Sequence, residues 1–182
     1  MVYLADVRNS GLEGNVLLVV GGLLQVGGLI GKVLGSLIQL AGLLMLYSAV
    51  RGFAERSGRE SAKNNFLKSL LIGIGGTGLW LVLIAKAPTF RSGLATYFYA
   101  MGTFAIVLIA SMYFERRVWM EFFYATRTEK FRDAANLLWY GALLSFLIIG
   151  FFIGLVGRIL LILAFADMPR RIEGGERPQW TL

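Results

Sequence analysis

Two isolated cations are the residues of this sequence whose type and position most suggest chemistry. Lys32 and Arg158 are the only ionisable side chains, apart from tyrosines, within four long apolar runs. A charged side chain at the centre of a bilayer costs at least about 2.5–3.5 kcal/mol, so each of the two needs a physical reason. The apolar runs cover residues 15–50, 69–85, 94–114 and 134–166.

Two interpretations apply to these cations. Lys32 and Arg158 could line a path for anions or bind the phosphates of lipids. Alternatively, each lies at the tip of a helical hairpin, from which its long side chain extends to the membrane surface. The sequence leaves both interpretations open.

Other kinds of chemistry lack the residues that they require. The sequence has no cysteine and no histidine, which argues against disulfides, thiolate nucleophiles and histidine-ligated zinc or haem. All eleven Asp and Glu residues lie outside the apolar runs or at their edges. Proton relays and many cation-coupled transporters need a carboxylate inside the membrane. We therefore expect no enzyme, no metal site and no cofactor.

The composition indicates that lipid is the solvent for most of the chain. Hydrophobic residues make up 57% of the sequence and charged residues only 16%, against about 25% charged residues in soluble domains. Backbone in hydrocarbon must satisfy its own hydrogen bonds, and the runs lack the alternation of barrel strands. We predict an all-α, polytopic helical membrane protein with a single domain over 1–182. The net charge of +7 does not indicate nucleic-acid binding, because the basic residues lie in short loops beside apolar spans.

The first apolar run is too long for one crossing of a membrane. As one straight helix, 15–50 would measure about 54 Å, against a hydrocarbon core of about 30 Å. A break at Gly31-Lys32 would divide it into helices at about 14–30 and 33–55. The last run poses the same problem, and its glycines and Arg158 mark the expected break. We expect helices at about 129–149 and 152–167 there, either as a hairpin or as a single interrupted crossing.

Between these two glycine-broken, hairpin-like segments lie two clear central spans. They are expected at about 64–86 and 93–125, since Pro88 cannot continue a helix that reaches Lys86. Residues 168–182 form a tail. If both broken segments are hairpins, fourteen of the eighteen Lys and Arg residues lie on one side of the membrane. The positive-inside rule then predicts a multi-pass protein of the cell membrane with both termini in the cytoplasm.

Small and polar residues inside the spans indicate how the helices associate. Gly27, Gly31 and Gly35 recur every four residues, as do Gly150 and Gly154, and such ridges let helices approach closely. A turn at Gly31 competes with its place on a continuous ridge. Four polar side chains within the spans are expected to form hydrogen bonds between helices: Gln25, Gln39, Thr77 and Ser145.

Apolar and glycine residues form a pattern in the C-terminal third: Phe131, Ala134, Leu137, Leu138, Gly141, Ala142, Leu144, Gly150, Ala164, Phe165 and Pro169. In these residues the chain resembles an archaeal membrane family, the domain of unknown function nine-nine-six. The resemblance rests on an apolar, glycine-rich pattern, and the glycine-broken segment at 15–50 fits it as well. It implies an archaeal source and a small polytopic protein, and it implies no activity. At Arg158 the chain departs from the pattern, where an aromatic or apolar residue is expected.

Two classes of function agree best with these features. The first is a structural or accessory protein that forms a homo-oligomer or a subunit of a larger membrane complex, with lipids and membrane proteins as its partners. The second is a channel or permease for a small neutral or anionic solute, suggested by the two broken segments. A lipid-acting enzyme is a third, but no acid–base or nucleophile constellation supports it.

Overall fold

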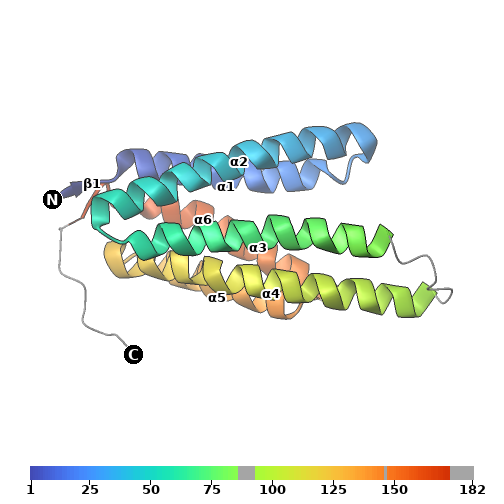
Figure 1. The fold of residues 1–182 in the computed structure, drawn as a ribbon. Helices are drawn as coiled ribbons and strands as arrows, with labels where there is room; N and C mark the ends of the chain where they lie inside the picture. The colour runs from blue at the N-terminus through green and yellow to red at the C-terminus, as the bar shows by residue number, and fades with distance from the viewer. Residues whose placement is uncertain (86–92, 146, 173–182) are drawn as a thin grey trace, which may run out of the picture.

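The structure, a computed structural model, describes residues 1–85, 93–145 and 147–172 (Figure 1). The fold class is the predicted one, because the described chain is almost entirely α-helical. Two short strands, β1 (Val2–Tyr3) and β2 (Arg171–Ile172), join the ends of the described chain. The helices are α1 (Ala5–Leu24), α2 (Gly28–Ser57), α3 (Glu60–Ala85), α4 (Gly93–Thr126), α5 (Glu129–Leu143) and α6 (Ile148–Asp167).

The helices form three antiparallel hairpins that lie side by side. Figure 1 shows α1–α2, α3–α4 and α5–α6 running from a common end near the N-terminus. Between hairpins, α2 contacts α3, α4 contacts α5 and α6 contacts α1, so the helices close into a ring. The α5–α6 hairpin is built from the shortest pair of helices, and its turn lies short of the far ends of the other two hairpins.

An aromatic cluster holds the common end of the hairpins together, and we call this the core end. Phe53 of α2 stacks on Phe122 of α4 with a centroid distance of 3.8 Å. Trp119, Phe131 and Phe165 pack around this pair from α4, α5 and α6, and all five rings are fully buried. Burying one side chain of this size contributes about 1.5–3 kcal/mol, so the cluster is a major source of stability.

The two ends of the described chain close the core end. Strand β1 pairs antiparallel with β2, and the backbone N–H of Leu4 donates to the carbonyl of Arg170 at 2.8 Å. Arg56, near the end of α2, donates to the carbonyl of Tyr3 at 3.2 Å and to the carboxylate of Asp6 at 2.6 Å. The hydrogen bond from Arg56, together with its charge, lowers the pKa of Asp6 below its usual value. These contacts tie α1, α2 and the segment after α6 to one another.

The parts of the hairpins beyond the core end expose apolar surface, and we call them the apolar arms. Leu29 in the first turn of α2 is 80% exposed, and Leu71 in α3 is 72% exposed. Phe151 in α6 is 70% exposed. By length and composition, three described segments suffice to cross a membrane: Gly28–Ser57, Glu60–Val82 and Ile149–Asp167. The arms therefore have the surface of a protein that is solvated by lipid.

The first hairpin turns earlier than the sequence predicted. Helices were expected at about 14–30 and 33–55 with the turn at Gly31-Lys32, whereas α1 ends at Leu24 and α2 begins at Gly28. Gly28 has a φ of +72°, a left-handed conformation that glycine adopts at little cost. Helix α1 also begins earlier than expected, because its polar first half packs into the core end, which hydropathy does not reveal.

The last hairpin also turns at a different place. Its helices were expected at about 129–149 and 152–167, with the break marked by the glycines from Gly150 onward and by Arg158, but α5 ends at Leu143 and α6 begins at Ile148. Arg158 therefore lies in the middle of α6. The central spans differ less from the expected 64–86 and 93–125, and residue 86 and most of the tail lie outside the described residues.

Glycines bring the helices of the first hairpin into backbone contact. A Cβ on Gly35 of α2 would collide with the carbonyl oxygen of Gly21 of α1, and one on Gly42 would lie 2.8 Å from that of Gly14. Gly31 lies against the carbonyl of Leu24, near the turn. Of the expected ridge, Gly31 and Gly35 thus face α1, whereas Gly27 precedes α2 as its N-cap and is part of the turn.

Glycines also bring the helices of the last hairpin into backbone contact. In the last hairpin, a Cβ on Gly141 of α5 would lie 2.9 Å from the carbonyl oxygen of Gly150 and 2.7 Å from the backbone nitrogen of Gly154. The glycines that were expected to break this segment instead allow α5 and α6 to approach closely.

Gly35→Ala should destabilise the α1–α2 hairpin by about 1–3 kcal/mol, because the added methyl group meets backbone that cannot move aside. The measurement is the midpoint of thermal unfolding in a mild detergent. Gly78→Ala is the matched control, since a Cβ there has no neighbour within 4 Å. The control should unfold at the same temperature or slightly higher, as alanine favours a helix over glycine. Equal midpoints for both variants would contradict the backbone contact.

Candidate functional site: a buried ion pair between hairpins

The most unusual polar group of the bundle is an ion pair between α4 and α6. The side chain of Glu115 is 5% exposed and that of Arg158 is 21% exposed. Nη1 of Arg158 lies 2.5 Å from Oε1 of Glu115, and Nη2 donates to Oε2 at 2.9 Å. The Nη2–Oε2 contact is a charge-assisted hydrogen bond, whereas the Nη1–Oε1 contact is a close ionic contact that lacks hydrogen-bond geometry.

A second hydrogen-bond donor fixes the carboxylate in place. Trp119 lies one helical turn after Glu115 on α4, and its indole Nε1 donates to Oε1 of Glu115 at 3.1 Å. The indole ring itself belongs to the aromatic cluster of the core end. Arg116, the next residue of α4, donates to Oδ1 of Asn136 on α5 at 3.1 Å. Helix α4 is therefore attached to both helices of the last hairpin through adjacent residues.

A serine pair continues this layer on the other side of α4. The hydroxyls of Ser69 on α3 and Ser111 on α4 lie 3.0 Å apart, and the hydroxyl of Ser111 also donates to the carbonyl of Ser69 at 3.0 Å. Both side chains are buried. We call the whole set the polar layer, because it separates the aromatic core end from the apolar arms. Its members are Ser69, Ser111, Glu115, Arg116, Trp119, Asn136 and Arg158.

The polar groups of this layer bind one another and thereby hold helices together. The Glu115 carboxylate and the Arg158 guanidinium neutralise each other, and both are held by hydrogen bonds rather than presented to a cavity. Within residues 1–85, 93–145 and 147–172, no cluster of three or more Asp, Glu, His or Cys residues could hold a metal ion. The layer joins helices that are far apart in the sequence at the point where the environment of the bundle changes.

The two cations that the sequence singled out lie in different places. Arg158 directs its guanidinium at Glu115, so its environment is an internal ion pair and not a hairpin tip. Lys32 lies near the turn of the first hairpin, at the far end of the apolar arms, and its side chain is exposed. The structure therefore does not bring the two cations together.

The sequence missed Glu115 because it stands at the edge of an apolar run. Arg116 and Arg117 follow it, so Glu115 looked like one of the charged residues that flank an apolar run at the membrane surface. The one local signal was Trp119 at helical spacing, which places an indole donor over the carboxylate. Nothing in the spacing of Arg158, 43 residues further along, pointed to Glu115.

Of the polar residues that were predicted to form hydrogen bonds between helices, Gln25 and Gln39 do so and, among the described residues, Ser145 does not. Nε2 of Gln25 donates to Oε1 of Gln39 at 2.7 Å, and Nε2 of Gln39 lies 3.4 Å from the carbonyl of Leu18 as a weak donor. These bonds connect α2 to α1 and to the turn between them. The hydroxyl oxygen of Ser145, in the turn of the last hairpin, is buried and has no hydrogen-bond partner within the described part of the chain.

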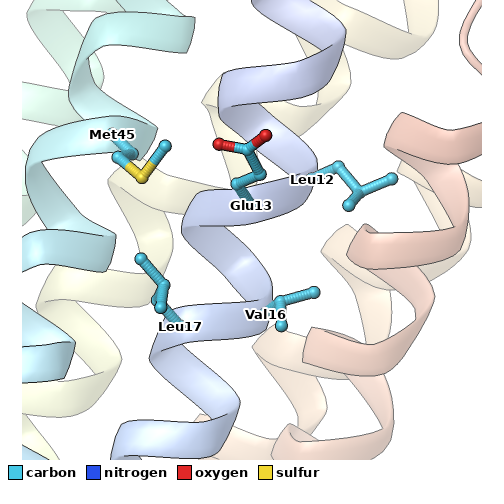
Figure 2. Close-up of a pocket in the computed structure, with 5 residues that line it drawn as sticks. All are labelled: Leu12, Glu13, Val16, Leu17 and Met45. Carbon is cyan, nitrogen blue, oxygen red and sulfur yellow. The ribbon is translucent and has the colours of Figure 1, made fainter.

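A shallow depression lies on the outside of the first hairpin. Figure 2 shows Leu12, Glu13, Val16 and Leu17 of α1 and Met45 of α2 around it. Its volume is about 250 Å³, and apart from the exposed carboxylate of Glu13 its lining is apolar. It adjoins the apolar arms and is separate from the polar layer.

Arg158→Met should destabilise the protein by about 3 kcal/mol, because it leaves the buried carboxylate of Glu115 without a cation. The double variant Glu115→Leu/Arg158→Met should regain most of this loss, since it removes both charges. The midpoint of thermal unfolding in detergent measures both effects. Arg51→Met breaks an exposed pair with Glu55 and should change the midpoint far less. A double variant as unstable as the single one would argue against the pair as the cause.

Comparison with known proteins adds one match. A family model described as "Protein of unknown function (DUF996)" matches residues 38–159, which is most of the chain. The matched segment contains both Glu115 and Arg158. No curated protein and no solved structure matches the chain.

Proposed function

The chain belongs to the DUF996 family of proteins of unknown function, and we propose that it is a structural or accessory component of the cell membrane. In this proposal the apolar arms lie in the bilayer, and the core end, with the N-terminus and β2, lies on the cytoplasmic side. The protein then acts by assembling with copies of itself or with another membrane protein.

The exposed apolar surface of the arms is the observation that carries this proposal. Water-soluble monomers rarely expose contiguous apolar patches larger than a few hundred Å². Here, most of the outward side chains of the arms are large and apolar, from Leu23 to Leu44 in the first hairpin and from Leu67 to Val82 in α3. Such a surface is stable only against lipid or another protein.

The dimensions of the arms suit a bilayer whose edge lies at the polar layer. From Ser69 to Ala85, helix α3 rises by about 24 Å, which is close to the thickness of the hydrocarbon core. From Arg158 to Ile148, helix α6 rises by only about 15 Å. Ile149–Asp167 is long enough to cross a membrane by itself, but its part beyond Arg158 is packed into the core end. In this proposal the last hairpin therefore enters the bilayer without crossing it, while the first two hairpins reach the opposite side.

The charge distribution supports the orientation. At the core end, α2, α3, α4 and α5 carry most of the described Lys and Arg residues, many of them beside acidic partners. Lys32 is the described cation at the opposite end of the arms. Basic residues accumulate on the cytoplasmic side of membrane proteins, so this asymmetry favours a cytoplasmic core end.

An accessory role agrees with how the polar groups are used. The Glu115–Arg158 pair, the serine pair and the Gln25–Gln39 pair are directed at neighbouring helices. Outward on the arms, glycines such as Gly75 and Gly78 leave open space around their Cα atoms. Small residues on an apolar helix face allow another helix to approach closely.

Single-cysteine labelling in whole cells tests the layout, because the sequence has no native cysteine. Asn9→Cys at the core end should react with a membrane-impermeant maleimide only after permeabilisation, and Val26→Cys in the first turn should react in intact cells. Leu71→Cys should stay unreactive until detergent is added, since lipid covers it. Labelling of Asn9→Cys and Val26→Cys from the same side would contradict the crossing.

Native mass measurement after gentle extraction tests the accessory role. We expect a defined species larger than one 20.1 kDa chain, composed of several copies or of this chain with another membrane protein. A chain that stays single in several mild detergents and in nanodiscs, at all concentrations, would contradict the proposal.

A further inference from the structure

Two exposed cations at the edge of the apolar arms differ from the basic residues of the core end that lie in ion pairs. Lys68 on α3 and Arg117 on α4 have no carboxylate within 4.0 Å in the described part of the chain. Both side chains are exposed. By contrast, seven cations of the core end and the polar layer lie in ion pairs: Arg51, Arg56, Arg59, Lys63, Lys130, Arg132 and Arg158.

Aromatic rings hold these two cations in place of carboxylates. Nζ of Lys68 lies 5.6 Å from the ring centroid of Phe114. The guanidinium of Arg117 lies 4.7 Å from the ring centroid of Tyr113, and its Nη2 donates to the hydroxyl of Tyr113 at 2.6 Å. Both contacts orient a cation without neutralising it. Phe114 and Arg117 are three residues apart on α4, so the two cations flank one turn of that helix.

An apolar stripe runs from these cations along the arm. Leu71, Gly75 and Gly78 follow Lys68 on α3 at helical spacing, and all three are exposed. A Cβ on either glycine would have no neighbour within 4 Å, so no other part of the protein covers the surface of α3 at Gly75 and Gly78. On α4, Ile106 is exposed at helical spacing from Tyr113. Positive charge therefore stands directly above an open hydrocarbon-like surface.

We propose that Lys68 and Arg117 bind the headgroup phosphate of an anionic phospholipid whose acyl chains lie along the α3–α4 arm. This inference rests on the proposed placement of the arms in the bilayer. That placement puts the polar layer, and with it these cations, at the depth of the lipid headgroups. Two cations without acidic partners suit a headgroup with net negative charge, because a zwitterionic headgroup supplies its own cation.

Native mass spectrometry of the full chain tests this site. The protein in detergent is mixed with phosphatidylglycerol or, in a parallel sample, with phosphatidylcholine, and the retained lipids are counted. The wild-type chain should retain phosphatidylglycerol in preference to phosphatidylcholine. Lys68→Gln/Arg117→Gln should bind phosphatidylglycerol about thirtyfold more weakly, given the attraction expected of two basic residues at a membrane surface.

A second double variant supplies the matched control. Arg51→Gln/Lys63→Gln also removes two cations of this end, but both are paired with carboxylates, Glu55 and Glu60. It should retain phosphatidylglycerol like the wild-type chain. Equal losses in both double variants would show a general effect of charge and overturn the site, as would unchanged retention in Lys68→Gln/Arg117→Gln.

Cysteine labelling keeps this inference separate from the proposed function. If Asn9→Cys, Val26→Cys and Leu71→Cys react as expected and phosphatidylglycerol shows no preference, only the lipid site fails. If Leu71→Cys reacts with the impermeant reagent in intact cells, the placement in the bilayer fails, and the lipid site fails with it.

Discussion

Burial of aromatic rings at one end of the bundle is the interaction on which the rest of the structure depends. Phe53, Trp119, Phe122, Phe131 and Phe165 come from four helices, and their mutual contacts bring all three hairpins together. The hydrophobic effect drives this packing where water reaches the protein. It does not act between helices that lipid surrounds, and the arms rely there on glycine contacts and on a few hydrogen bonds between helices.

In the proposed placement, the polar layer lies where these two environments meet, which accounts for its composition. A charged pair deep among the arms would be desolvated by lipid, whereas at the core end it would displace aromatic packing. Between the two, the Glu115–Arg158 pair is neutral as a unit, receives a further hydrogen bond from Trp119 and links α4 to α6. Lys68 and Arg117, which have no carboxylate partner in the described part of the chain, lie on α3 and α4 beside the polar layer and are exposed, so in this proposal they face the lipid headgroups.

Much of the helical layout was predictable because hydropathy and glycine content act locally. The length of the run 15–50 required a break, and the limits expected for the central spans are close to those of α3 and α4. The turns themselves were misplaced. At the first hairpin, Gly27 and Gly28 compete with Gly31, and only the backbone shows that Gly28 takes the left-handed conformation while Gly31 packs against α1.

The sequence by itself determined that the chain is helical, that lipid covers its apolar runs and that no thiol or imidazole takes part in its chemistry, because composition and hydropathy depend only on which residues are present. The tertiary structure alone decided the partner of Arg158. Its charge made a hairpin tip plausible, but Glu115 lies two helices away. A pair so distant in the chain forms only when the packing of whole hairpins brings the side chains of α4 and α6 within reach of each other. Local sequence patterns carry no information about that packing, since it depends on the contacts that all the helices make with one another in the common core.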